Sequence, residues 1–165
     1  MTKFSFIVNE KFKGGRYMEY DLTIDTSTGK LNVRVAAWIE QNNEILISSF
    51  PDGNISLPGG RVKFGETSLE AITREIMEET GEALYNPKLY AVIENFFNAG
   101  NNFHEYLFIY KGTVRQKDTY EGIDKNNQVI SWSNIENVNR LKPYCLKELI
   151  NTPSHDGVLH LINKD

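Results

Sequence analysis

The chain has 165 residues, which is enough to bury a substantial core, and we expect one domain because no linker or repeat divides it. Its apolar runs, such as Val35 to Ile39, are far too short to span a bilayer, so no membrane association is expected. The formal net charge of −4, without a basic run, argues against binding of long nucleic acids, whose phosphates require clustered Lys and Arg.

Two features predict a cytoplasmic protein. Cys145 is the only cysteine, so no intrachain disulfide can form, and we expect this residue to be packed like a small apolar side chain. Residues 1–6 hold one Lys, and the polar residues at 9–11 interrupt any apolar stretch of the kind found in export signals.

The N-terminal part of the sequence is rich in residues that favour strands. Phe4 to Val8 and Tyr17 to Ile24 are the two candidates, and Gly14-Gly15 lies between them as a turn. We expect residues 1–31 to form a β extension at one edge of the sheet, within the same domain as residues 32–165.

Three further strands are predicted before the main helix. Val33 to Ile39 and Glu44 to Ser48 are joined through Asn42 and Asn43, which suit a tight hairpin. Ile55 to Leu57 is a short strand that runs directly into a Pro-Gly-Gly loop.

A helix is predicted from Ser68 to about Thr80. Thr67 and Glu70 have the spacing of a capping box at its start, and Gly81 is placed to end it in a left-handed conformation. Leu69, Ile72 and Ile76 recur at helical spacing, and we expect them to form the buried stripe.

The rest of the chain alternates between strands and short helices. A turn at Asn86-Pro87 is expected before the next strand. The predicted elements are strands at Leu89 to Phe96 and His104 to Val114, a loop at Lys125 to Gln128, a strand at Val129 to Trp132, short helices near Asn134 to Asn137 and from Pro143 to Ile150, and a strand at Val158 to Ile162. This order indicates an α/β fold with a mixed sheet.

The predicted helix carries an unusual acidic cluster. Glu75, Glu78 and Glu79 stand at i, i+3 and i+4, which places three carboxylates together and opposes helix formation by a few tenths of a kcal/mol per pair. A divalent cation would reverse the sign of that effect, whereas a solvated acidic face is the simpler alternative. Upstream, Gly59 and Gly60 lack side chains, so their backbone can approach a metal or a phosphate closely.

The spacing of these residues is similar to a known motif. Gly60, five residues, Glu66, seven residues and then the run from Arg74 to Gly81 resemble the Nudix box of the Nudix hydrolase (MutT-like) family. Glu82 departs from the pattern, because an aliphatic residue usually follows the final glycine. The resemblance implies a Nudix-type α/β/α sandwich with a mixed central sheet, covering roughly Asn32 to Ile150.

The resemblance also implies roles for individual residues. Glu75, Glu78 and Glu79 would bind Mg²⁺ or Mn²⁺, with the Gly59 carbonyl as a further ligand. Arg74 would orient the glutamates, and Glu66 would support the loop. The reaction implied is the hydrolysis of a diphosphate linkage in a nucleoside diphosphate joined to another group, nucleoside triphosphates included.

Residues outside the box are candidates for the remaining roles. The proton acceptor is Glu75 or Glu78, or an acidic residue of a later loop, where Glu121 is preferred over Asp118 and Asp124. Only one of His104 and Glu105 can point toward the site, because neighbouring side chains of a strand face opposite ways. The aromatic residues Phe96, Phe97, Phe103 and Tyr106 can stack on a base or serve as core packing, with Phe96 and Phe103 as the preferred substrate contacts.

Other functions on the same fold remain open. A nucleotide-sensing Nudix domain without catalysis is one alternative, although every acidic position of the box is intact. An isopentenyl-diphosphate isomerase is another, but Cys145 is poorly placed for its catalytic cysteine. The expected partner is a nucleotide-type small molecule, namely a nucleoside triphosphate, a nucleotide sugar, a dinucleoside polyphosphate or, least favoured, a triphosphorylated RNA end. A homodimer is left open.

Overall fold

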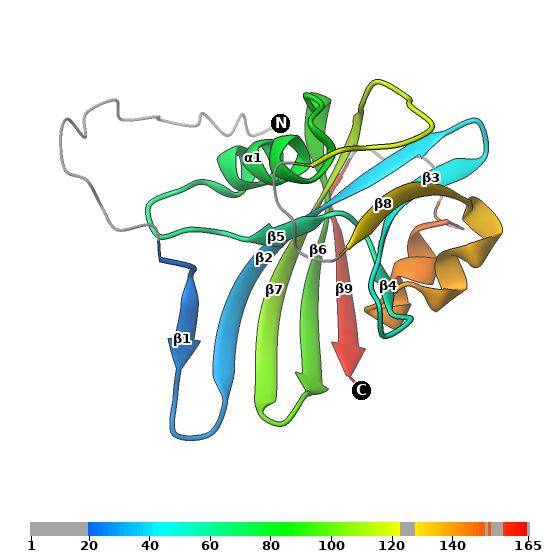
Figure 1. The fold of residues 1–165 in the computed structure, drawn as a ribbon. Coiled ribbons are helices and arrows are strands. Elements are labelled where there is room, and N and C mark those ends of the chain that lie inside the picture. The colour runs from blue at the N-terminus through cyan, green and yellow to red at the C-terminus, as the bar shows by residue number, and fades with distance from the viewer. Residues whose placement is uncertain (1–19, 123–127, 151, 153–156, 165) are drawn as a thin grey trace, which may run out of the picture.

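The computed structural model describes residues 20–122, 128–150, 152 and 157–164. In this part of the chain, one α-helix lies across a face of the sheet that the strands form (Figure 1). The elements are β1 (Thr23–Asp25), β2 (Lys30–Gln41), β3 (Glu44–Ser49), β4 (Ile55–Ser56), β5 (Gly59–Arg61), α1 (Ser68–Thr80), β6 (Tyr85–Asn98), β7 (Asn102–Thr113), β8 (Val129–Asn134), the 3₁₀ helices η1 (Ile135–Arg140) and η2 (Tyr144–Leu149), and β9 (Leu159–Lys164).

The sheet is mixed, as the sequence predicts. Its main path runs β4-β3-β2-β7-β6-β9; β1 and β5 also pair with β2, and β8 pairs with β3. The β2–β7 and β6–β9 pairs are parallel, whereas β6 and β7 form an antiparallel pair. Asn42 and Asn43 have φ values of 52° and 65°, so the expected tight turn joins β2 to β3.

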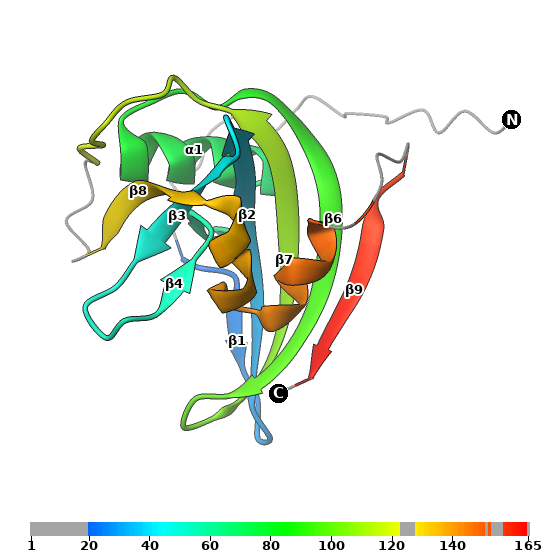
Figure 2. The same cartoon turned by 90° about the vertical axis from the view of Figure 1, so that its right-hand side faces the viewer.

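Helices cover both faces of this sheet (Figures 1 and 2). Alternation along β2 sends Val35 and Ala37 toward α1, where they pack with Ile72 and Ile76. The next residues in the alternation, Ala36 and Trp38, face the opposite way and meet the segment containing η2. Two cores therefore lie on either side of the sheet, and the fold is an α/β/α sandwich.

Both ends of α1 have the predicted caps. The Thr67 hydroxyl accepts a hydrogen bond from the Glu70 backbone N–H at 3.2 Å, and the Glu70 carboxylate accepts one from the Thr67 N–H at 2.8 Å. Gly81 has φ 70° and its N–H donates to the Met77 carbonyl at 2.9 Å. These contacts satisfy backbone groups that a helix end leaves without partners.

Two predictions about local structure were wrong. Leu69 is 44% exposed, and Ala71 joins Ile72 and Ile76 in the buried stripe instead. Helical spacing gives the direction of a side chain, but burial also depends on how far along the helix the sheet reaches. Asn86-Pro87 lies inside β6 rather than before it, at a shift in register between Tyr85 and Lys88. Such an irregularity accommodates a proline, which has no N–H for the ladder.

Cys145 belongs to η2 and is buried in the core, as expected. The two predicted C-terminal helices are both 3₁₀ helices. The strand predicted at Phe4 to Val8, the first residues of the one at Tyr17 to Ile24 and residues 125–127 lie outside the described residues. None of the helices in the described ranges is long and apolar enough to cross a membrane.

Candidate active site

Arg74 connects the acidic residues of the helix to the preceding loop. Its Nε and Nη2 donate to the two oxygens of Glu66 at 2.8 and 3.0 Å, and its Nη1 donates to Glu75 at 2.7 Å and to Glu78 at 3.1 Å. The hydrogen bonds to Glu66 are the main reason why the pKa of Arg74 is raised. Burial opposes ionisation of Glu66, but the bonds from Arg74 and the Lys63 N–H lower its pKa overall. The arginine therefore fixes three carboxylates in one geometry.

Glu75 lies directly against the backbone of Gly60. A Cβ placed on Gly60 would stand 2.4 Å from the carboxyl carbon of Glu75, so only glycine leaves room for this carboxylate. Burial raises the pKa of Glu75, and the hydrogen bond from Arg74 opposes the rise. The lack of a side chain at Gly60 on β5 thus makes room for the carboxylate of Glu75 on α1.

Glu79 is the most buried carboxylate of the cluster, with 8% of its surface exposed. One oxygen accepts the Gly59 N–H at 2.9 Å and the other accepts the Gln128 amide at 2.6 Å. Burial raises the pKa of Glu79 to about 7 despite these bonds. Gly59 has φ 147°, and a Cβ there would stand 2.2 Å from the Val35 carbonyl, so both its conformation and its surroundings require glycine.

The three helix glutamates line one cavity of about 400 Å³, here called the carboxylate cavity. Its described lining consists of Asp21, Arg34, Phe50, Ser56, Gly59, Gly60, Arg61, Lys63, Arg74, Glu75, Glu78, Glu79 and Gln128. Carboxylate oxygens suit Mg²⁺ or Mn²⁺, and the raised pKa values of Glu75 and Glu79 reflect buried negative charge that a cation would balance. Within the described ranges, however, no three acidic, His or Cys side chains converge as a preassembled metal cage. The donor set fits a cation that keeps water and is completed by substrate oxygens.

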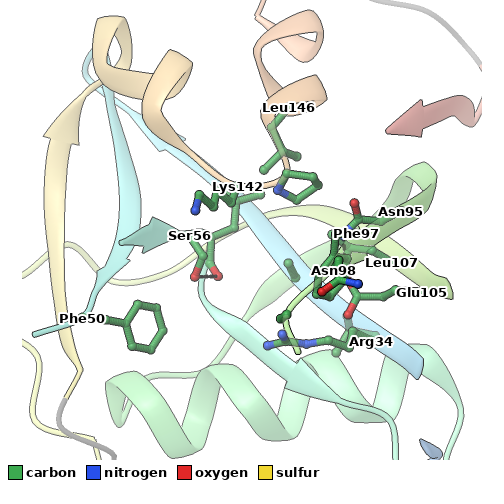
Figure 3. Close-up of a pocket in the computed structure, with 15 residues that line it drawn as sticks. Arg34, Phe50, Ser56, Asn95, Phe97, Asn98, Glu105, Leu107, Lys142 and Leu146 are labelled. Carbon is green, nitrogen blue, oxygen red and sulfur yellow. Dashed lines mark hydrogen bonds between the residues drawn. The ribbon is translucent and has the colours of Figure 1, made fainter. Parts of the chain in front are cut away.

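A second cavity adjoins the first and is here called the side pocket. It measures about 500 Å³, and Figure 3 shows its lining residues from β2, β6, β7 and the segment before η2. Arg34, Phe50 and Ser56 line both cavities. Phe97, Leu107 and Leu146 give the side pocket apolar walls, and Asn95 and Glu105 add polar groups.

The aromatic candidates from outside the Nudix box do not all face the side pocket. Phe103 stacks on Phe97, with ring centroids 4.8 Å apart and planes within 4°. Phe97, which sequence reasoning did not prefer, lines the side pocket. Phe96 lies on the other face of β6 and packs against His104, with centroids 4.4 Å apart, so it is not among the residues described as lining either cavity.

The acidic candidates from outside the Nudix box also lie in different parts of the molecule. Glu105 is the inward member of the His104-Glu105 pair, but it faces the side pocket rather than the carboxylate cavity. Glu121 has an exposed side chain, and its backbone carbonyl lies beside Gly81 at the end of α1. It is not among the residues described as lining the carboxylate cavity. Asp124 lies outside the described residues.

Arg34 and Asn95 are site residues that the sequence reasoning missed. A polar residue inside an otherwise apolar strand is the one signal that could have found them. Which cavity such a residue faces depends on strand register, which the sequence pattern does not supply.

The α/β/α sandwich, and the glutamates of α1 at the wall of one cavity, are what the resemblance to the Nudix box implies. The profile of the NUDIX domain matches residues 30–151. The chain therefore belongs to the Nudix family, and it is a Nudix pyrophosphohydrolase, which confirms the resemblance of the box.

Solved structures of this family are similar to the chain. A NUDIX hydrolase from Nitrosomonas europaea shares 25% identity with a TM-score of 0.57, over 72% of this chain and 85% of that one. A MutT NUDIX hydrolase from Burkholderia pseudomallei shares 26% identity with a TM-score of 0.55, over 67% and 86%. An ADP-ribose pyrophosphatase from Streptococcus suis has a TM-score of 0.55 over 78% and 98%, but at 16% identity it shows the fold alone.

Proposed function

We propose that this enzyme hydrolyses the diphosphate linkage of a nucleotide-type substrate, with the diphosphate in the carboxylate cavity and the nucleoside in the side pocket. The observation that supports this most directly is that the two cavities share Arg34, Phe50 and Ser56. One extended molecule can therefore occupy both. The apolar walls and few polar groups of the side pocket suit a small organic ring.

Nudix hydrolases generally use divalent metal ions. In this chain Glu75, Glu78, Glu79 and the Gly59 carbonyl would hold Mg²⁺ or Mn²⁺. A cation held there supplies charge neutralisation and Lewis acidity to the phosphate oxygens. The chain's own contribution is to keep the carboxylates in place: Arg74 holds Glu75 and Glu78, while the Gly59 N–H and Gln128 hold Glu79.

Arg34 is the proposed phosphate contact between the two cavities. Its Nε is buried and has no hydrogen-bond partner among the described residues. A buried donor without a partner is costly, and a phosphate oxygen of the substrate would satisfy it. Arg34 is also close enough to Glu79 for its charge to oppose the rise in pKa that burial causes.

In the proposed reaction, water attacks one phosphorus, the bond from that phosphorus to the bridging oxygen breaks, and the bridging oxygen leaves with its electron pair. The proton of the attacking water goes to a carboxylate of the box, Glu75 or Glu78. Both line the carboxylate cavity, whereas the exposed Glu121 is not among its described residues. Our proposal therefore favours the box over the later loop as the source of the proton acceptor.

A product assay tests this function. The purified enzyme would be incubated with Mg²⁺ or Mn²⁺ and a panel of nucleoside triphosphates, nucleotide sugars and dinucleoside polyphosphates, and phosphate, pyrophosphate and monophosphate would be measured. We expect hydrolysis of at least one compound, abolished by EDTA. Tight binding without turnover of any compound would contradict the proposal and favour a nucleotide-sensing domain.

A further inference from the structure

A row of buried polar side chains crosses the sheet beneath the side pocket. Asn32 on β2 pairs in register with Glu105 on β7, Glu105 pairs with Asn95 on β6, and Asn95 pairs with Asn163 on β9. All four residues are buried. The adjacent row on the same face consists of Arg34, Leu107, Ile93 and Leu161, so on β7, β6 and β9 the polar groups replace an apolar surface.

The hydrogen bonds of this row run in one direction and end at Glu105. The Asn163 amide donates to the Asn95 oxygen at 2.9 Å, and the Asn95 amide donates to Glu105 Oε1 at 3.1 Å. A carboxylate only accepts hydrogen bonds, so the chain of donors stops there. The carboxylate is thereby held in one orientation at the wall of the side pocket.

Two hydrogen-bond acceptors near the Glu105 end of the row have no donor among the described residues. Glu105 Oε2 has no hydrogen bond to the described residues, and the buried Asn32 Oδ1 also has none. Of the two cations that line the side pocket, Lys142 precedes η2, whereas Arg34 lies on the same face of the sheet as Glu105, one row along on the neighbouring strand (Figure 3). No hydrogen bond or ion pair joins Arg34 to Glu105 among the described residues, so a ligand that reaches the free oxygen of Glu105 can bring its own donor to it.

From this arrangement we infer that Glu105 reads the edge of a nucleobase, and that the preferred base presents two adjacent N–H donors. The inference rests on the proposed function, because it requires the nucleoside to enter the side pocket. Guanine places a ring N–H beside an exocyclic amino group, which matches the two oxygens of a carboxylate. Adenine and cytosine place a ring acceptor beside their amino group, and uracil has one N–H between two carbonyls. The lone pairs of these acceptors would repel the carboxylate oxygens of Glu105.

The aromatic wall of the side pocket suits a planar base that lies next to Glu105. Phe97 lines the pocket and is backed by the parallel ring of Phe103, which provides a flat apolar surface next to Glu105. Stacking on an aromatic side chain tolerates any base. Selectivity among bases must then come from contacts with the edge of the base, and Glu105 is the acidic side chain among the residues described as lining this pocket.

A binding series with nucleoside monophosphates tests the inference. Calorimetry with GMP, IMP, AMP and UMP in the presence of Mg²⁺ is expected to show GMP binding about tenfold or more tightly than AMP, because charged hydrogen bonds give differences of this size. IMP keeps the ring N–H and lacks the amino group, so it should fall between them. Equal affinities for the four compounds would overturn the inference, and this ranking requires no variant.

The variant Glu105→Gln adds a second test with a matched control. Glutamine presents one donor and one acceptor, so the preference for GMP over AMP should fall by about tenfold. Glu94→Gln is the control, because Glu94 precedes Asn95 on the opposite face of β6 and bonds His160 at 2.8 Å. An unchanged preference in Glu105→Gln would overturn the inference. Absence of hydrolysis for every nucleotide contradicts the proposed function, whereas hydrolysis without base preference contradicts only the role of Glu105.

Discussion

Arg74 and Glu66 form a two-point ion pair across the loop and the helix, with N–O distances of 2.8 and 3.0 Å. The pair is mostly buried, because the side chains are only 20% and 15% exposed. A planar guanidinium is required for two parallel hydrogen bonds, and lysine cannot replace it. The ion pair therefore links the stability of this loop to the geometry of the glutamates.

The first prediction concerns this ion pair. Arg74→Lys should lower the free energy of unfolding by about 1–3 kcal/mol, because lysine keeps the charge but cannot make the two parallel hydrogen bonds to the largely buried Glu66. Arg61→Lys is the matched control, since Arg61 pairs with Asp21 at 3.1 Å and both side chains are about half exposed. Urea unfolding of both variants measures the difference, and equal losses would show that burial of the Arg74 pair has no special effect.

The second prediction concerns Gly60. Gly60→Ala should reduce kcat by at least about tenfold, because the added Cβ would stand 2.4 Å from the Glu75 carboxyl carbon and displace it. Gly157→Ala should leave kcat unchanged, since a Cβ there meets no atom within 4 Å. Steady-state kinetics of both variants measures the effect. Full activity of Gly60→Ala would show that catalysis does not depend on the position of Glu75.

The third prediction concerns pH and stability without metal. The pKa of Glu79 is about 7 in the folded protein, against 4.5 for an ordinary glutamate. The unfolded chain therefore releases this proton first, and the folded state loses stability as pH rises from about 4.5 to about 7. The lowered pKa of Glu66 has the opposite sign, because its stabilisation is lost as pH falls.

Glu79→Gln separates these contributions. The variant should reduce the loss of thermal stability between pH 4.5 and 7, while the contribution of Glu75, whose pKa burial also raises, remains. Gln128 can reverse its amide to bond the new side chain. Thermal unfolding in EDTA at several pH values measures the effect. The same variant should lower kcat by about a hundredfold or more, because a ligand charge is removed. An unchanged pH profile would mean that Glu79 is not the group that titrates.

The fourth prediction concerns Arg34. Arg34→Gln should raise KM about tenfold through loss of a charged contact to phosphate. Arg61→Gln is the control, because Arg61 also lines the carboxylate cavity but already pairs with Asp21. If both variants change KM equally, the effect comes from general positive charge rather than from the position of Arg34.

The sequence was sufficient to predict the acidic helix and its caps. The capping box, the glycine end and the spacing of Glu75, Glu78 and Glu79 are set by contacts within a few residues of each other, so local rules apply. The partners of Arg74 follow the same principle, because Glu66 and Glu78 lie within eight residues of it.

The side pocket could not be predicted in the same way. Asn32, Asn95 and Glu105 come together only through strand register, and a shift by one residue would turn each side chain to the other face. The same alternation explains why Phe97, and not Phe96, lines the pocket. Gln128 reaches Glu79 across 49 residues of sequence, and no local pattern indicates that contact.

The most direct test of the central claim is a crystal structure with Mn²⁺ and a non-hydrolysable nucleoside diphosphate analogue, examined by anomalous scattering. We expect a manganese peak bounded by Glu75, Glu78 and Glu79, with the diphosphate beside Arg34 and the base in the side pocket. A carboxylate cavity without manganese while the analogue is bound elsewhere on the molecule would contradict it.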